Sequence, residues 1–146
     1  MKNPPKGWPR ISSALFYEDP ARAIDWICSA FGFEVRLRVE GEGGRIEHSE
    51  LEFGEGLIMV GGAREAGRSD RPERASPRSL GGLTTQELCI HVDDVDGHCE
   101  RARSAGARIL LEPKTEDYGD DYWADRSYLA EDPEGHRWWF MQRMRG

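Results

Sequence analysis

The chain has 146 residues, with 20 Lys and Arg against 27 Asp and Glu, so its formal net charge is −7. This length suits one domain with a sizeable core, or two half-domains that are each too small to bury a core separately. The acidic balance argues against a nucleic-acid partner, because a nucleic-acid surface requires clustered positive charge to displace counterions.

The cysteines and the N-terminus bear on the cellular compartment. Cys28, Cys89 and Cys99 are an odd number without C-x-x-C spacing, so the sequence predicts neither a disulfide framework nor a thiolate zinc site. Residues 1–10 are polar and interrupted by prolines, and no later apolar run has the length of a membrane span. We therefore expect an unprocessed, soluble, cytoplasmic protein without a membrane partner.

The first half of the chain predicts the order strand, helix, strand, strand, strand. A strand over 11–17 leads to Asp19, which is suited to an N-cap, and to Pro20 at the first helical position. The helix has apolar residues at three- and four-residue spacing and ends at Gly32. The glycine-separated strands that follow cover residues 33–39, 46–53 and 57–60.

The second half predicts the same order after an aperiodic connector at 62–85. Its expected elements are a strand at 86–92, a helix at 94–105, a strand at 108–112, a long aromatic loop at 114–126, and strands at 127–131 and 137–142. With an offset of 75 residues, Ile24 falls on Cys99 and Ile27 falls on Ala102. A duplicated half-domain implies a pseudo-symmetric fold with a shared cavity.

Four segments stand in order between residues 11 and 142: DPARAIDWICSAFGFE, HSELEFGEGLIMVGG, VDDVDGHCERARSAGARIL and DRSYLAEDPEGHRWWF. Together they resemble the glyoxalase, bleomycin-resistance and dioxygenase group, the vicinal oxygen chelate superfamily. The resemblance implies a glyoxalase-like α+β fold, in which two βαβββ modules form a curled mixed sheet around a U-shaped cavity. We expect a single domain over 1–146, with modules at 11–61 and 86–142. The resemblance also implies a homodimer.

Metal enzymes of this superfamily hold a divalent metal with His or Glu side chains on the first and last strands of each module. The equivalent positions in this chain are Ser12, Met59 (or Val60), Glu87 and Trp139. Only Glu87 is a good ligand for a divalent metal, and one carboxylate cannot replace the three or four protein ligands of a stable site. We therefore expect the glyoxalase-type metal site to be absent, and no cofactor.

A second polar set lies on the predicted strand at 46–53. His48 and Glu50 share one face of this strand, because successive side chains point to opposite faces. If this face looks into the cavity, the two side chains approach Glu87 and His91 and form an unusual metal or acid–base cluster. Otherwise they form a hydrogen-bonded wall or a solvated face, as charged strand faces usually do.

Aromatic residues mark the predicted loop at 114–126 and its end. Tyr118, Tyr122, Trp123 and Tyr128 stand among several aspartates. Aromatic faces beside carboxylates suit a flat or cationic ligand, through stacking and cation–π attraction. The same rings could instead anchor the loop to the body or fill a dimer interface.

Four further side chains have an expected place. Trp138 and Trp139 point to opposite faces of one strand, and counting along that strand assigns Trp139 to the cavity and Trp138 to the core. His98 is expected at the surface or boundary of the second helix. Cys89 is expected to be a small packing residue.

Two functions remain from different classes. The first is a metal-independent protein that binds a small organic ligand, cationic or aromatic, as in antibiotic sequestration. Its expected contacts are the side chains assigned to the cavity: Ser12, His48, Glu50, Met59, Glu87, His91, Tyr122, Trp123 and Trp139. The second is a metal-dependent lyase, isomerase or dioxygenase with a displaced metal site around His48, Glu87 and His91.

Overall fold

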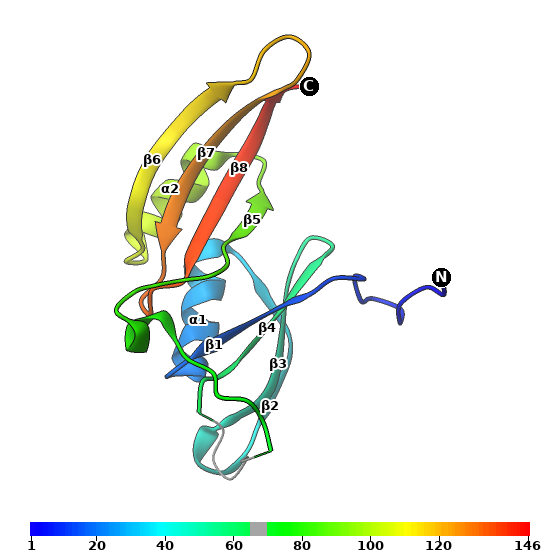
Figure 1. Ribbon diagram of the computed structural model, residues 1–146, viewed down its shortest axis with the longest axis vertical. Helices are drawn as coiled ribbons and strands as arrows, with labels where there is room; N and C mark the ends of the chain where they lie inside the picture. The colour runs from blue at the N-terminus through cyan, green and yellow to red at the C-terminus, as the bar shows by residue number, and fades with distance from the viewer. Residues whose placement is uncertain (65–69) are drawn as a thin grey trace. The chain divides into compact units, whose positions relative to one another are not determined.

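The computed structural model describes residues 1–64 and 70–146, which divide into two compact units, Met1–Ser76 and Pro77–Gly146. Each unit holds a four-stranded mixed sheet with one helix packed against it (Figure 1). The element order within each unit is βαβββ, so the predicted α+β fold of two such modules is confirmed. None of the helices in the described part of the chain is long and apolar enough to cross a membrane.

The first unit follows the predicted element order closely. Its elements are β1 (Ser13–Tyr17), α1 (Pro20–Phe31), β2 (Glu34–Glu40), a 3₁₀ turn (Glu42–Gly44), β3 (Ile46–Phe53) and β4 (Gly56–Gly62). The strand order across the sheet is β1-β4-β3-β2. Strand β1 runs parallel to β4, and the other neighbours are antiparallel. This order makes β1 and β2 the edge strands.

Helix α1 begins and ends at the predicted residues. The Asp19 carboxylate accepts a hydrogen bond from the Arg22 backbone N–H at 3.1 Å, which satisfies one free donor of the first turn. Gly32 adopts φ +83° and donates its N–H to the Cys28 carbonyl at 3.1 Å, a helix ending that suits glycine because it has no Cβ.

The last three strands of the second unit are longer than the sequence predicted. Its elements are a 3₁₀ turn (Pro77–Leu80), β5 (Leu88–His91), α2 (Val95–Ser104), β6 (Arg108–Asp117), β7 (Ala124–Glu131) and β8 (Arg137–Arg145), with sheet order β5-β8-β7-β6. The predicted loop at 114–126 is wrong, because β6 and β7 stay paired as far as Asp117 and Ala124. Only a six-residue turn remains, and the Tyr118 N–H donates to the Trp123 carbonyl across it at 2.9 Å.

The duplicated helix positions lie in the two cores. Ile24 and Ile27 on α1 are fully buried, and so are their repeat partners Cys99 and Ala102 on α2. The same positions of each helix therefore face its own sheet. The offset of 75 residues is a structural repeat.

A buried carboxylate organises the turn between β7 and β8. The Asp132 side chain is 4% exposed, and its Oδ1 accepts from the backbone N–H groups of Glu134 at 3.0 Å and His136 at 3.1 Å. Its Oδ2 accepts from the indole Nε1–H of Trp138 at 3.1 Å. The Trp138 ring is fully buried, so this carboxylate satisfies a donor that has no access to water.

We expect Asp132→Ala to lower the free energy of unfolding by about 2–4 kcal/mol, because it leaves the buried indole donor and two turn N–H groups without their acceptor. Urea unfolding followed by circular dichroism measures this change. The control Asp93→Ala removes an exposed carboxylate and should change the stability by less than about 0.5 kcal/mol. Equal effects of the two variants would contradict the role of Asp132.

His98 lies at the boundary of the second helix, within the expected range of surface or boundary, and contacts the buried Tyr128. His98 is half-buried, its Nδ1 lies 2.7 Å from the Tyr128 hydroxyl, and its ring centroid lies 4.2 Å from that of Phe140. Tyr128 is fully buried within β7 and does not belong to the aromatic turn. Burial raises the pKa of the Tyr128 hydroxyl.

This shift predicts a loss of stability at alkaline pH. The unfolded chain releases the tyrosine proton near the ordinary pKa of about 10, whereas the folded chain retains it, so the free energy of unfolding falls as pH rises above about 10. In Tyr128→Phe this contribution is absent, and we expect a shallower fall between pH 9 and 11 in urea unfolding. If the free energy of unfolding fell equally steeply with pH in wild type and Tyr128→Phe, Tyr128 would have the same pKa in the folded and unfolded chains.

Candidate functional site

Each sheet has one face covered by the helix of its own unit; the other is called here the helix-free face. In the first sheet, Leu15, Leu51 and Val60 are buried on the helix side. Alternation along β3 and β4 then assigns His48, Glu50 and Met59 to the helix-free face. Ser12 lies just before β1, and its buried hydroxyl oxygen has no hydrogen-bond partner within residues 1–64 and 70–146.

Glu50 is the centre of a charged cluster on this helix-free face. Its side chain is 8% exposed, and its Oε2 lies 3.2 Å from Nε of Arg36. Its Oε1 lies 3.0 Å from Nε2 of His48, whose side chain is 42% exposed. A buried carboxylate requires a partner of opposite charge, and Arg36 supplies it.

The sequence analysis did not identify Arg36 or Trp8 as site residues. Arg36 lies at a register shift between Val35 and Leu37 of β2, and a bulge of this kind re-aims a side chain. Its guanidinium also donates to the Gly7 carbonyl and lies 5.3 Å from the centroid of the Trp8 ring. The available signals were an arginine between the apolar Val35 and Leu37 and a tryptophan between Gly7 and a proline.

Strand β3 is also irregular beside Glu50. The Ser49 hydroxyl donates to the Val60 carbonyl at 2.6 Å and accepts from the Val60 N–H at 3.0 Å. The regular pairing of β3 with β4 extends from Phe53 to Leu51. Beyond Leu51, the Ser49 side chain makes the hydrogen bonds to Val60 that a backbone group of β3 would make in a regular sheet. Glu50 therefore lies between a bulge in one neighbouring strand and a side-chain bridge to the other.

In the second unit, the helix-free face carries a direct contact between Glu87 and Trp139. The indole Nε1–H of Trp139 donates to Oε2 of Glu87 at 2.8 Å. Trp138 is fully buried on the helix side, whereas Trp139 is half-buried on the opposite side, as predicted. Trp139 pairs with Cys89 on β5 and with Leu129 on β7.

Cys89 and His91 are exposed on β5 beside this pair. The expected packing role of Cys89 is therefore wrong, because its side chain is exposed rather than packed. Partial burial and the nearby Glu87 carboxylate raise the pKa of the Cys89 thiol. The thiol is consequently protonated at neutral pH and is a weak nucleophile.

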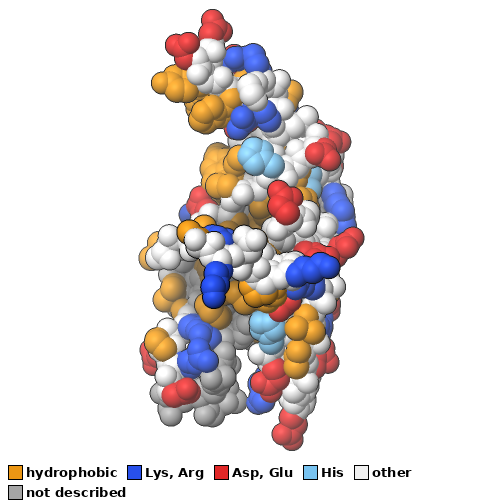
Figure 2. Space-filling model, turned by 90° about the vertical axis from the view of Figure 1, so that its right-hand side faces the viewer, with side chains coloured by type: hydrophobic (Ala, Val, Ile, Leu, Met, Phe, Trp, Pro, Cys, Tyr) orange, Lys and Arg blue, Asp and Glu red, His pale blue; other side chains and the backbone are white. Residues whose placement is uncertain are grey.

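The aromatic residues of the β6–β7 turn form an exposed group. Tyr118, Tyr122 and Trp123 are 56%, 63% and 41% exposed, and their ring centroids lie 5.9 Å (Tyr118–Trp123) and 6.1 Å (Tyr122–Trp123) apart. The Arg143 guanidinium lies 5.1 Å from the Trp123 centroid and pairs with Asp125 at 2.6 Å. In Figure 2, apolar, acidic and basic side chains gather at the upper end, over this hairpin.

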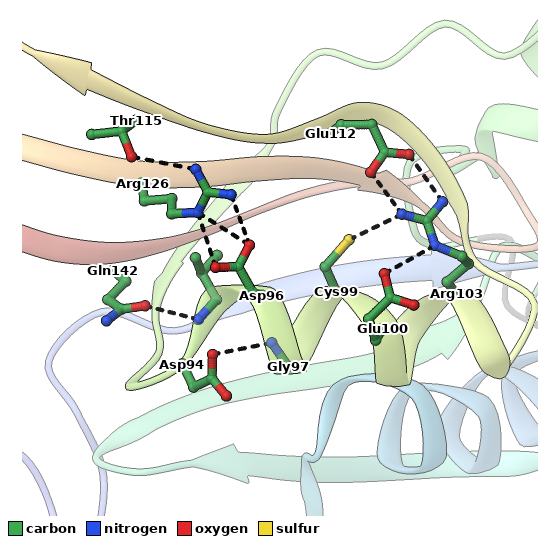
Figure 3. A network of polar contacts seen from close by, with 11 residues as sticks. Asp94, Asp96, Gly97, Cys99, Glu100, Arg103, Glu112, Thr115, Arg126 and Gln142 are labelled. Atoms are coloured by element: carbon green, nitrogen blue, oxygen red, sulfur yellow. Dashed lines mark hydrogen bonds and ion pairs between the residues drawn. The ribbon is translucent and has the colours of Figure 1, made fainter.

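The helix-covered side of the second sheet carries a separate polar network (Figure 3). Arg126 on β7 binds Asp96 on α2, with Nη2 2.9 Å from Oδ1. Arg103 on α2 binds Glu112 on β6 at 2.6 Å and lowers the pKa of that carboxyl. These pairs join α2 to its sheet, so their role is structural.

Comparison with known proteins identifies the family. The chain matches the family model of the Glyoxalase/Bleomycin resistance protein/Dioxygenase superfamily over residues 10–140. It belongs to this superfamily. An uncharacterized protein of Mycobacterium tuberculosis is 32% identical over 142 residues, which cover 94% of this chain and 76% of the relative. An uncharacterized protein of Mycobacterium bovis has the same identity, with 85% of its length covered.

Solved structures agree with this family membership. TioX from Micromonospora sp. ML1 is 34% identical, with a TM-score of 0.69 over 93% of this chain and 99% of TioX. A glyoxalase/bleomycin resistance protein/dioxygenase from Alicyclobacillus acidocaldarius has a TM-score of 0.62 over 99% of this chain and 96% of its own. Its identity of 13% supports the fold alone.

The metal of the superfamily's enzymes does not fit the residues at its four positions. Ser12 and Met59 offer a hydroxyl and a thioether, which are poor ligands for a hard divalent cation. Trp139 offers an indole that donates its proton to Glu87, the one carboxylate of the set. Within the described residues, no group of three or more His, Cys, Asp or Glu side chains could hold a metal ion. The displaced set draws on both units, His48 from the first and Glu87 and His91 from the second, and stays a prediction.

Proposed function

We propose that this superfamily member binds a small organic ligand, aromatic or cationic, without a metal ion. The observation that carries the proposal is the hydrogen bond between Trp139 and Glu87. These two residues stand at two of the four positions that hold the metal in the superfamily's enzymes. The pair presents an aromatic face and a carboxylate in place of metal ligands.

The chemistry of the pair supports this choice of ligand. Oε2 of Glu87 accepts the indole proton, while the carboxylate keeps its negative charge and its second oxygen. An indole face beside a carboxylate attracts a cation or an electron-poor ring. The superfamily is named in part for bleomycin resistance, which agrees with the antibiotic sequestration expected from the sequence.

The remaining proposed contacts lie on helix-free faces or at the hairpin turn. They are Ser12, His48, Glu50 and Met59 in the first unit, and His91, Tyr122 and Trp123 in the second. Four of them, His48, His91, Tyr122 and Trp123, leave a large part of the side chain exposed. Exposed aromatic rings of this kind are enriched at binding sites.

We expect a calorimetric screen of cationic antibiotics, including bleomycin, and of aromatic quaternary ammonium ions to find binding at micromolar concentrations. Trp139→Leu should weaken that binding about tenfold or more, because the aromatic face and the donor to Glu87 are both lost. Trp139→Phe retains the ring and should have an intermediate effect.

Glu87→Gln tests the charge separately from the hydrogen bond, because the amide oxygen still accepts from the indole. It should weaken cationic ligands more than neutral aromatic ones. Glu55→Gln, at an exposed turn of the first unit, is the matched control and should bind like wild type. A screen without micromolar binding, or equal affinities for wild type and Trp139→Leu, would count against the proposal.

Metal content provides an independent measurement. We expect elemental analysis of protein purified from zinc-, iron- and manganese-supplemented growth to give well under one equivalent of any divalent metal, because a stable site requires three or four protein ligands. A stoichiometric metal that is lost in Glu87→Ala would instead support the displaced site around His48, Glu87 and His91.

A further inference from the structure

We propose that His48, oriented by Glu50, accepts a hydrogen bond from a hydroxyl group on an aromatic ligand. This inference rests on the proposed ligand-binding function and specifies one chemical group of the ligand. It is carried by three observations on the helix-free face of the first sheet. These are the contacts of Glu50, the free nitrogen of His48, and the apolar side chains opposite both.

The contacts of Glu50 determine which nitrogen of His48 carries the proton. A carboxylate accepts hydrogen bonds, so a His48 ring that carries one proton holds it on Nε2, which lies 3.0 Å from Oε1. Nδ1 is then an acceptor. In the described part of the chain Nδ1 has no partner, and the ring is partly exposed.

Arg36 keeps the carboxylate in this role. Its Nε lies 3.2 Å from Oε2, the carboxylate oxygen that does not face His48. The guanidinium is fixed on its other side by the Gly7 carbonyl and the Trp8 ring. Glu50 is thus held from both sides and acts on a ligand only through His48, which makes Glu50 a positioning residue.

Apolar side chains lie directly opposite the two polar ones. Val39 pairs with His48 and Leu37 pairs with Glu50 across β2 and β3. Directly opposed side chains in antiparallel strands lie about 5 Å apart at Cβ. Leu37 and Val39 are 42% and 41% exposed, so an apolar surface adjoins His48 and Glu50. A ligand that matches both features combines a ring with a hydrogen-bond donor such as a hydroxyl.

The test compares two probes that differ at one oxygen, which carries a hydrogen in 4-methylphenol and a methyl group in 4-methylanisole. Both have the same ring, and the methyl ether cannot donate to Nδ1. Titrations of ¹⁵N-labelled protein followed by backbone amide shifts on β2 and β3 give both affinities. We expect the phenol to bind about three- to tenfold more tightly than the ether, the range that one hydrogen bond supplies.

Variants assign this preference to the two residues. His48→Phe retains a ring without an acceptor and should reduce the affinity ratio to about one, while the ether still binds. Glu50→Gln removes the charge that selects the tautomer and should lower the ratio in part. Glu52→Gln makes the same change two residues along the same face and should leave the ratio unchanged.

The ratio is insensitive to a general loss of stability, which would weaken both probes alike. Equal affinities in wild type, an unchanged ratio in His48→Phe, or no saturable shift with either probe would overturn the inference. The Trp139→Leu experiment is separate. If that variant weakens cationic ligands while the phenol and the ether bind equally, the proposed function stands and only the role of His48 fails.

Discussion

A sheet that is covered on one side by a single helix must bury every second side chain of its strands. Both units of this chain are subject to this constraint. In the first unit Ile24 and Ile27 of α1 lie over Leu51 and Val60 of the sheet; in the second unit Cys99 and Ala102 of α2 occupy the equivalent helix positions. The strand residues between the buried ones point to the helix-free face and do not pack against the helix. Glu50, Met59 and Trp139 belong to this second set, and Glu87 lies just before β5.

The same constraint explains which parts of the fold were predictable from sequence. Helix α1 was predicted because Asp19 and Gly32 mark its ends and its apolar spacing marks its buried face. The β6–β7 hairpin was missed because its outer half is polar and has no apolar alternation. Its pairing is supported instead by charges across the strands and at the end of β8, such as Arg143 with Asp125 and Arg145 with Asp117.

The sheet faces of the candidate residues were predictable from sequence, but their contacts were not. Strand parity correctly assigned Trp138 to the core and Trp139 to the opposite side, since it depends only on alternation. The contact of Arg36 with Glu50 depends on a bulge, which shifts the register by one residue and cannot be read from alternation. The contact of His98 with Tyr128 was not predicted either, because the two residues are distant in the sequence.

The carboxylates on the two helix-free faces differ in their exposure to solvent, and this difference bears on function. Glu87 is exposed, so it keeps its hydration and its contact with Trp139 adds little to stability. Glu50 is buried. The desolvation free energy of a buried ion exceeds the Coulomb energy of its ion pair unless the hydrogen bonds of the ion are also satisfied. An apolar residue at position 50, opposite Leu37, would pack without this cost. A sequence selected for stability alone therefore has no need of Glu50, Arg36 and the bulge that joins them. Their presence is explained if the cluster holds the His48 ring in one tautomer beside an apolar surface.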